Sequence, residues 1–171
     1  MTDAAETNGT TGGAATAPGD QVQVRVVGQY IKDLSFESPN LQKMLSGTPE
    51  NPNLTLDLDV RPEQIGPDLY ETSLVFKARA ESSTVGVIYE MELIYGGLFK
   101  IEKAPPQAVE VMLNINGPHL LFPYLRRLVS DLTREGGFPP LLLDPVDFGA
   151  LFMRKRAQQP PTGQQPPPAT A

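Results

Sequence analysis

A strict alternation of apolar and polar residues is the feature that most restricts how this chain can fold. It is clearest over residues 54–60, where three leucines and a valine alternate with a threonine and two aspartates, and it recurs over residues 22–26, 70–79 and 85–95. Successive side chains of a strand point to opposite faces, so each run predicts a strand with one face toward a core. Four such runs separated by Pro, Gly and Asn predict an antiparallel sheet, with residues 81–84 as a hairpin link.

The pattern changes after residues 96–97, two glycines that we expect to form a bend out of the last strand. A helix is predicted to begin at Pro105 or Pro106, and a break to follow at residues 116–118 (Asn-Gly-Pro). The next helix carries a leucine seam and ends at a Gly-Gly pair; a proline-stiffened connection and a short last helix then follow over residues 138–156. Strands followed by helices predict an α+β fold, a four-stranded antiparallel sheet with helices packed on one face.

Apolar side chains exceed what one helical layer can cover. In residues 85–95, Ile88 and Ile94 interrupt the polar side of the strand, so both faces carry apolar residues. The second face is expected to form an oligomer interface or to be covered by the N-terminal loop. Residues 116–153 are also rich in large apolar side chains, which is typical of a surface that contacts something outside the monomer.

Composition divides the chain into three parts. Residues 1–20 are rich in Thr, Gly and Ala, and residues 157–171 are mostly Gln and Pro, so both are expected to be disordered tails around a single domain at 21–156. The start lacks the basic and apolar regions of a signal peptide, no run is long enough to span a membrane, and there is no cysteine. These features predict a cytoplasmic protein. The formal charge of −6 argues against nucleic acid as a partner.

Residues that could carry catalysis are few. His119 is the single histidine, and no recognisable nucleophile motif accompanies it, so a capping or surface role is favoured over that of a general base. Asp57 and Asp59 share one side of their strand, an arrangement that suits a cation but is more often just a solvated acidic face. Neither GxGxxG nor a P-loop motif occurs. The sequence therefore predicts no cofactor and no metal, and favours binding over catalysis.

Several segments, in order along the chain, resemble the SecB family of bacterial protein-export chaperones. They are YIKDLSFESPN (30–40), LDLDV (56–60), ELIYGGLF (92–99), GPHLLFPYLRR (117–127) and GGFPPLLLDPVDFGALFM (136–153). The resemblance implies a sheet with helices packed on it, assembled as a homotetramer that is a dimer of dimers. It also implies an ATP-independent chaperone, not an enzyme, that holds unfolded presecretory proteins and delivers them to the SecA motor. A dedicated partner such as an antitoxin is the alternative client.

The resemblance also implies roles for particular residues. The SecA-binding candidates are Asp33, Glu37, Glu92 and Glu90. Glu90 departs from the family pattern, because the family can carry an apolar residue at that position of the patch. Asp33 and Glu37 are expected to share a side if their segment turns like a helix. The client-groove candidates are Leu54, Leu56, Leu58, Leu141, Leu143, Phe148 and Phe152. The subunit-interface candidates are Tyr30, Met91, Leu93 and Tyr95. For each apolar residue, plain core packing is the alternative. The Gln- and Pro-rich tail has no basic residue, which leaves a tail contact with SecA in doubt.

Overall fold

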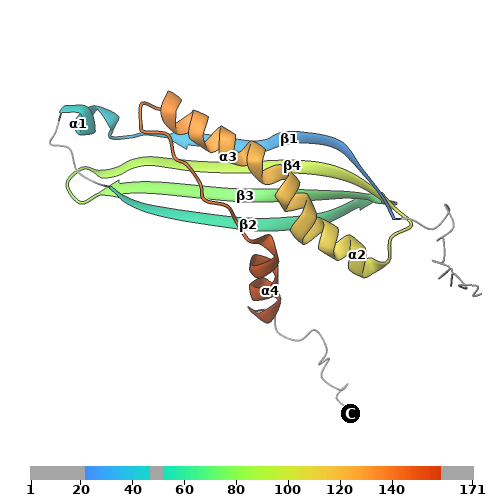
Figure 1. The fold of residues 1–171 in the computed structure, drawn as a ribbon. Coiled ribbons are helices and arrows are strands. Elements are labelled where there is room, and N and C mark those ends of the chain that lie inside the picture. Colours follow the sequence, from blue (N-terminus) through green and yellow to red (C-terminus); the bar gives the residue numbers. More distant parts are fainter. Residues whose placement is uncertain (1–21, 47–51, 159–171) are drawn as a thin grey trace, which may run out of the picture.

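The sheet is antiparallel, with the strand order β1-β4-β3-β2, so that β1 and β2 form its two edges (Figure 1). This computed structural model describes residues 22–46 and 52–158, and the two predicted tails lie almost entirely outside these ranges. The strands are β1 (Gln23–Glu37), β2 (Asn53–Gly66), β3 (Leu69–Ser82) and β4 (Gly86–Glu102). The prediction of a four-stranded antiparallel sheet followed by helices is confirmed, as is the hairpin between β3 and β4.

Helices cover one face of this sheet (Figure 1). They are α1 (Leu41–Ser46), α2 (Pro106–Val111), a π-helical segment η1 (Met112–Asn116), α3 (Gly117–Glu135) and α4 (Phe148–Gln158). In Figure 1, α3 crosses this face diagonally, and the connection between α3 and α4 runs over the same side toward β2. Among the described residues, no helix lies on the opposite face, which we call the open face. None of the helices in these ranges is both long and apolar enough to cross a membrane.

The core lies between α3 and the covered face. Leu74 and Phe76 of β3 and Leu93 of β4 are at most 2% exposed and share one apolar cluster with Leu121 and Leu125 of α3. Full burial of such a side chain contributes about 1.5–3 kcal/mol. The alternation read from the sequence over β3 is therefore correct: its apolar side faces the helices.

Two local predictions are wrong. Residues 116–118 do not break the helical run, because a π turn carries α2 into α3, with the Gly117 N–H donating to the carbonyl of Met112. Pro118, at the beginning of α3, has no N–H to donate, and the π turn accommodates it without ending the helical run. The pair Gly96-Gly97 is no bend either, since β4 continues to Glu102. A Cβ at Gly97 would lie 2.6 Å from Cδ2 of Leu121, so glycine there permits α3 to approach the sheet closely.

Candidate protein-binding surfaces

The predicted acidic residues gather at one end of the open face. In the β1–β4 register Glu37 is opposite Glu90, Ser35 is opposite Glu92 and Asp33 is opposite Ile94. Strand side chains alternate, so residues two or four apart share a face. Asp33 and Glu37 therefore lie on the same side because β1 extends to Glu37, and the expected helical turn is wrong.

A hollow of about 430 Å³ lies among these side chains. Its charged lining consists of Glu37, Asp57, Glu90, Glu92, Lys77 and Arg79, and we call this group of six the charged patch. Lys77 and Arg79 come from β3, between the acidic residues of β4 and the edge strand β2. The patch is thus built by all four strands of one rigid sheet, with an excess of carboxylates.

Both cations of the charged patch are in ion pairs. The Lys77 Nζ lies 2.6 Å from an Oε1 of Glu92, and the Arg79 guanidinium pairs with Glu90 and, at 3.3 Å, with Glu81. Hydrogen bonds to Glu81 and Glu90 raise the pKa of Arg79. All of these side chains are about half exposed, and exposed ion pairs of this kind contribute little to folding stability.

A second polar cluster on the open face centres on Glu71, which sequence reasoning missed. Glu71 is only 6% exposed, accepts a 2.8 Å hydrogen bond from the Ser73 hydroxyl, and is contacted by the Tyr30 hydroxyl and the Lys32 ammonium. Burial opposes ionisation of Glu71, but the bonds from Lys32, Tyr30 and Ser73 outweigh it and lower its pKa. The hydrogen bond to Glu71, with burial, raises the pKa of Tyr30 to about 12. The ring of Tyr30 reaches Glu71 by lying over Gly96, where a Cβ would be 3.3 Å from it.

The predicted subunit-interface residues divide between surface and core. Tyr30 is 39% exposed on the edge strand β1. Met91 and Leu93 are 1% and 0% exposed, since they point from β4 toward the helices, and their assignment to an interface is corrected to core packing. Tyr95 lies on that covered face too, 8% exposed and stacked on Tyr124 with ring centroids 6.2 Å apart.

The exposed apolar surface instead follows β1. Large apolar residues that are 39–48% exposed line this edge strand on both faces: Val24, Val26, Val27, Tyr30, Ile31 and Leu34. A long edge strand with apolar side chains offers both unpaired backbone groups and apolar area to another chain. The sequence indicates β4 as the interface strand, because apolar residues on both faces are more evident in its sequence than in that of β1.

The predicted client groove is partly surface and partly core. Leu54 and Leu56 are 39% and 45% exposed on β2, on the face that carries α3, and Leu58 next to them is half-buried. Leu141, in the connection after α3, and Phe152 of α4 are half-buried. Leu143 and Phe148 are 6% and 0% exposed, because both belong to the core cluster beneath the helices, so their assignment to the groove is corrected. Two further apolar residues of the segment 136–153, Leu142 and Met153, are 66% and 65% exposed.

Two polar contacts fix the connection and α4 that border this apolar surface. The fully buried Thr133 hydroxyl accepts a 2.9 Å hydrogen bond from the Leu141 N–H, which holds the start of the connection against α3. The Lys155 Nζ donates at 2.8 Å to both Asp59 Oδ1 and the Val60 carbonyl, which ties α4 to β2. Burial opposes ionisation of Asp59, but the interactions with Lys155, the Val60 N–H and Arg61 together outweigh it and lower its pKa.

Groups associated with catalysis are not brought together. His119 is exposed and meets the ring of Phe148 edge-on at 5.0 Å. Asp57 and Asp59 face different partners, Lys77 by register and Lys155 by hydrogen bond. Within residues 22–46 and 52–158, no three acidic or histidine side chains are placed to hold a metal ion. The fold and its two surfaces, one charged and one apolar, therefore describe a protein-binding α+β domain of the chaperone type.

Comparison with known proteins places this domain in a family. The model of the preprotein translocase subunit SecB matches residues 17–159. A protein-export protein SecB of Hyphomonas neptunium is 46% identical over 135 residues, covering 79% of this chain and 80% of its own. The corresponding protein of Parvibaculum lavamentivorans is 38% identical over 160 residues, covering 94% and 95%. This chain belongs to the SecB family.

A solved structure shows the same fold at lower similarity. It is a SecB-like chaperone of Mycobacterium tuberculosis in complex with a peptide from an antitoxin, with a TM-score of 0.55 and 17% sequence identity. The match covers 72% of this chain and 90% of the other. At that identity the likeness shows the fold alone.

Proposed function

We propose that this protein is a cytoplasmic, ATP-independent export chaperone that holds unfolded presecretory proteins and delivers them to SecA. The observation that carries the proposal is the separation of two surfaces on one sheet. Half-exposed leucines lie on the helix-covered face at β2, while the acidic residues lie on the open face. Relatives at 38–46% identity that are named protein-export protein SecB support it.

The apolar surface suits clients without a fixed sequence. Burial of apolar area contributes about 25 cal/mol per Å² whatever the order of the residues, so Leu54 and Leu56 would favour any extended apolar segment. A folded protein hides such segments. The unpaired edge of β2 adds main-chain hydrogen-bond groups to the same surface.

The charged patch suits the motor. Asp33, Glu37, Glu90 and Glu92 share the open face, where carboxylates would steer and orient a basic surface of SecA. Client and motor then bind opposite faces of the sheet, and neither has to displace the other. The motor, not the chaperone, would use ATP.

We further propose a homotetramer, a dimer of dimers, with the edge strand β1 at one of its interfaces. Its exposed apolar side chains on both faces support this arrangement, and Tyr30 would lie within it. Several client surfaces on one assembly would raise affinity through effective concentration. Light scattering at micromolar concentration tests this directly: a mass near four subunits is expected, and a monomer contradicts it.

The test of client binding compares one presecretory protein in two states. Isothermal titration calorimetry with the precursor diluted from urea should give binding, and the same precursor after folding should give none. Equal affinity for both forms contradicts the proposal. A dedicated antitoxin-like partner is the second candidate, favoured only by the fold shared with the antitoxin-peptide complex. Pull-down from cells separates the two, because many signal-bearing precursors are expected for export and a single partner for the alternative.

A further inference from the structure

The charged patch contains cations that a surface for a basic partner does not need. Its lining has four carboxylates, but it also has Lys77 and Arg79 at its centre. In the β3 register, Lys77 lies between Glu92 of β4 and Asp57 of β2, and Arg79 lies beside Glu90. The two cations therefore occupy positions next to the carboxylates that a basic partner would approach.

The ion pairs formed by these cations have little to do with folding. The Lys77 and Glu92 side chains are 51% and 52% exposed, and those of Arg79 and Glu90 are both 45% exposed. Pairs this open to water exchange readily, so a partner can replace them. Binding nevertheless carries two unfavourable contributions. The partner's cation must displace the internal one from its carboxylate, and it then remains close to that like charge.

We propose that Lys77 and Arg79 are built-in competitors that lower the affinity of the charged patch for a basic surface and keep that contact transient. The inference rests on the function proposed above, in which SecA supplies the basic surface. A chaperone that hands over its client has to release the motor as well, and a purely acidic patch would hold it longer. Lys77 and Arg79 thus limit the affinity of the patch, Lys77 through Glu92 and Arg79 through Glu90 and Glu81.

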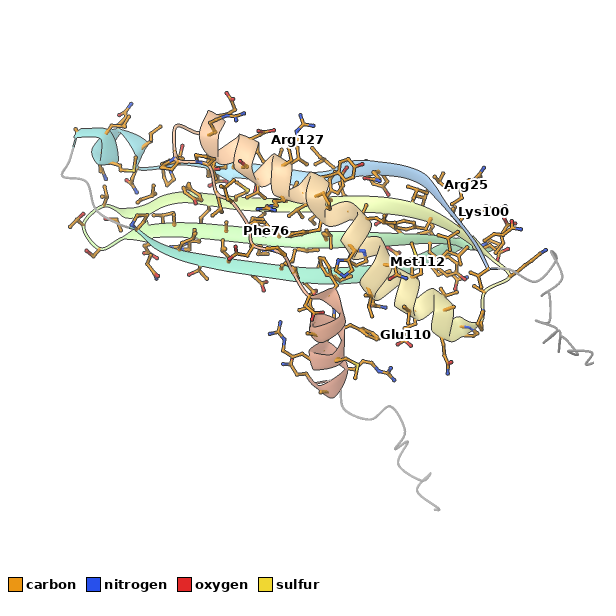
Figure 2. All side chains as sticks on the ribbon, viewed as in Figure 1. Arg25, Phe76, Lys100, Glu110, Met112 and Arg127 are labelled. Carbon is orange, nitrogen blue, oxygen red and sulfur yellow. The ribbon has the colours of Figure 1, made fainter. Side chains whose placement is uncertain are left out.

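Another ion pair on the same face provides a matched control. The Lys100 Nζ lies 2.9 Å from Oε1 of Glu102, with 38% and 41% of the side chains exposed, which closely resembles the Lys77–Glu92 pair. Figure 2 shows Lys100 beside Arg25 at the end of the sheet away from the β3–β4 hairpin, and neither lines the patch. Lys100→Gln therefore removes the same charge and the same kind of pair without changing the patch.

The experiment measures SecA binding to the full-length chain by biolayer interferometry across a series of salt concentrations. The variants are K77Q, R79Q, K77Q/R79Q and the control K100Q, all checked for unchanged melting temperature and assembly. At low salt each patch substitution should lower Kd about threefold and the double variant about tenfold, partly through faster association. The gain should shrink toward none at high salt, where exposed charges are screened. K100Q should stay within about twofold of the unsubstituted chain.

The outcomes separate this inference from the proposed function. If the unsubstituted chain does not bind SecA, the proposed function fails. If it binds, but K77Q/R79Q binds equally well, more weakly, or no better than K100Q, the competitor role is overturned.

A second arm tests the route through Glu92. Lys77→Gln is repeated in an E92Q background, where Lys77 no longer has a carboxylate opposite it on β4. Most of the increase in SecA affinity caused by Lys77→Gln should then disappear. A gain that persists in full shows that Lys77 repels the partner directly, and contradicts competition for Glu92.

Discussion

Replacing Leu54 and Leu56 with serine tests whether the exposed leucines of β2, on the helix-covered face, bind clients. These leucines are 39% and 45% exposed, so a bound segment could bury roughly two-fifths of each. Full burial of a leucine contributes about 1.5–3 kcal/mol, and the remaining fraction therefore corresponds to about 1 kcal/mol for each side chain. The double variant L54S/L56S should lose about 2 kcal/mol of binding free energy, or about thirtyfold in Kd.

The assay is fluorescence anisotropy of a labelled precursor diluted from urea into the chaperone. Because the buried parts of both leucines also support the sheet, urea unfolding should show a stability loss of about 2 kcal/mol, and binding must be measured where the variant is still folded. Ile65 lies farther along β2 and is 47% exposed, so I65S is the matched control and should leave Kd within about twofold. If L54S/L56S binds as tightly as I65S, the client surface does not lie where we place it.

Three further variants test other parts of the structure. The double variant D33A/E37A should weaken SecA binding about tenfold while client binding persists, and loss of both in the same titrations would point to misfolding instead. Lys155→Met should loosen α4, which hydrogen exchange of its amides would report; lack of any change would contradict the tie to β2. Because the pKa of Asp59 is lowered in the folded protein, its interaction with Lys155 stabilises the fold above about pH 4, and this stabilisation is lost as pH falls through the lowered pKa. The free energy of unfolding of K155M should therefore depend less on pH in the acid range, which urea unfolding at several pH values would measure. Gly97→Ala should cost about 1–3 kcal/mol in urea unfolding because a Cβ meets α3, and a neutral result would contradict that close approach.

Local patterns were sufficient for the sheet and for its two faces. The alternation over residues 70–79 correctly assigns Leu74 and Phe76 to the core, because successive side chains of a strand point to opposite faces and the apolar set marks the buried one. The same logic, applied to a β1 that extends to Glu37, would have placed Asp33 and Glu37 on one face. The strand was predicted too short because its apolar residues, Ile31, Leu34 and Phe36, do not alternate strictly.

Features that depend on distant parts of the chain were not predictable. Lys155 and Asp59 are 96 residues apart, and neither sequence context reveals the pair. Gly97 looked like a bend because the approach of α3 that requires it is a tertiary contact. Phe148 was assigned to a groove because sequence shows that a segment is apolar, but only packing decides which of its side chains remain exposed.

The central claim is that client and motor occupy opposite faces of one sheet, and a three-component titration tests it most directly. Labelled unfolded precursor is bound to the chaperone, and SecA is added without nucleotide while the anisotropy of the precursor and the mass of the complex are followed. We predict a ternary complex in which the precursor stays bound and its Kd changes by less than about threefold. Displacement of the precursor in proportion to SecA binding would show that the two share one surface, and would contradict the two-face account.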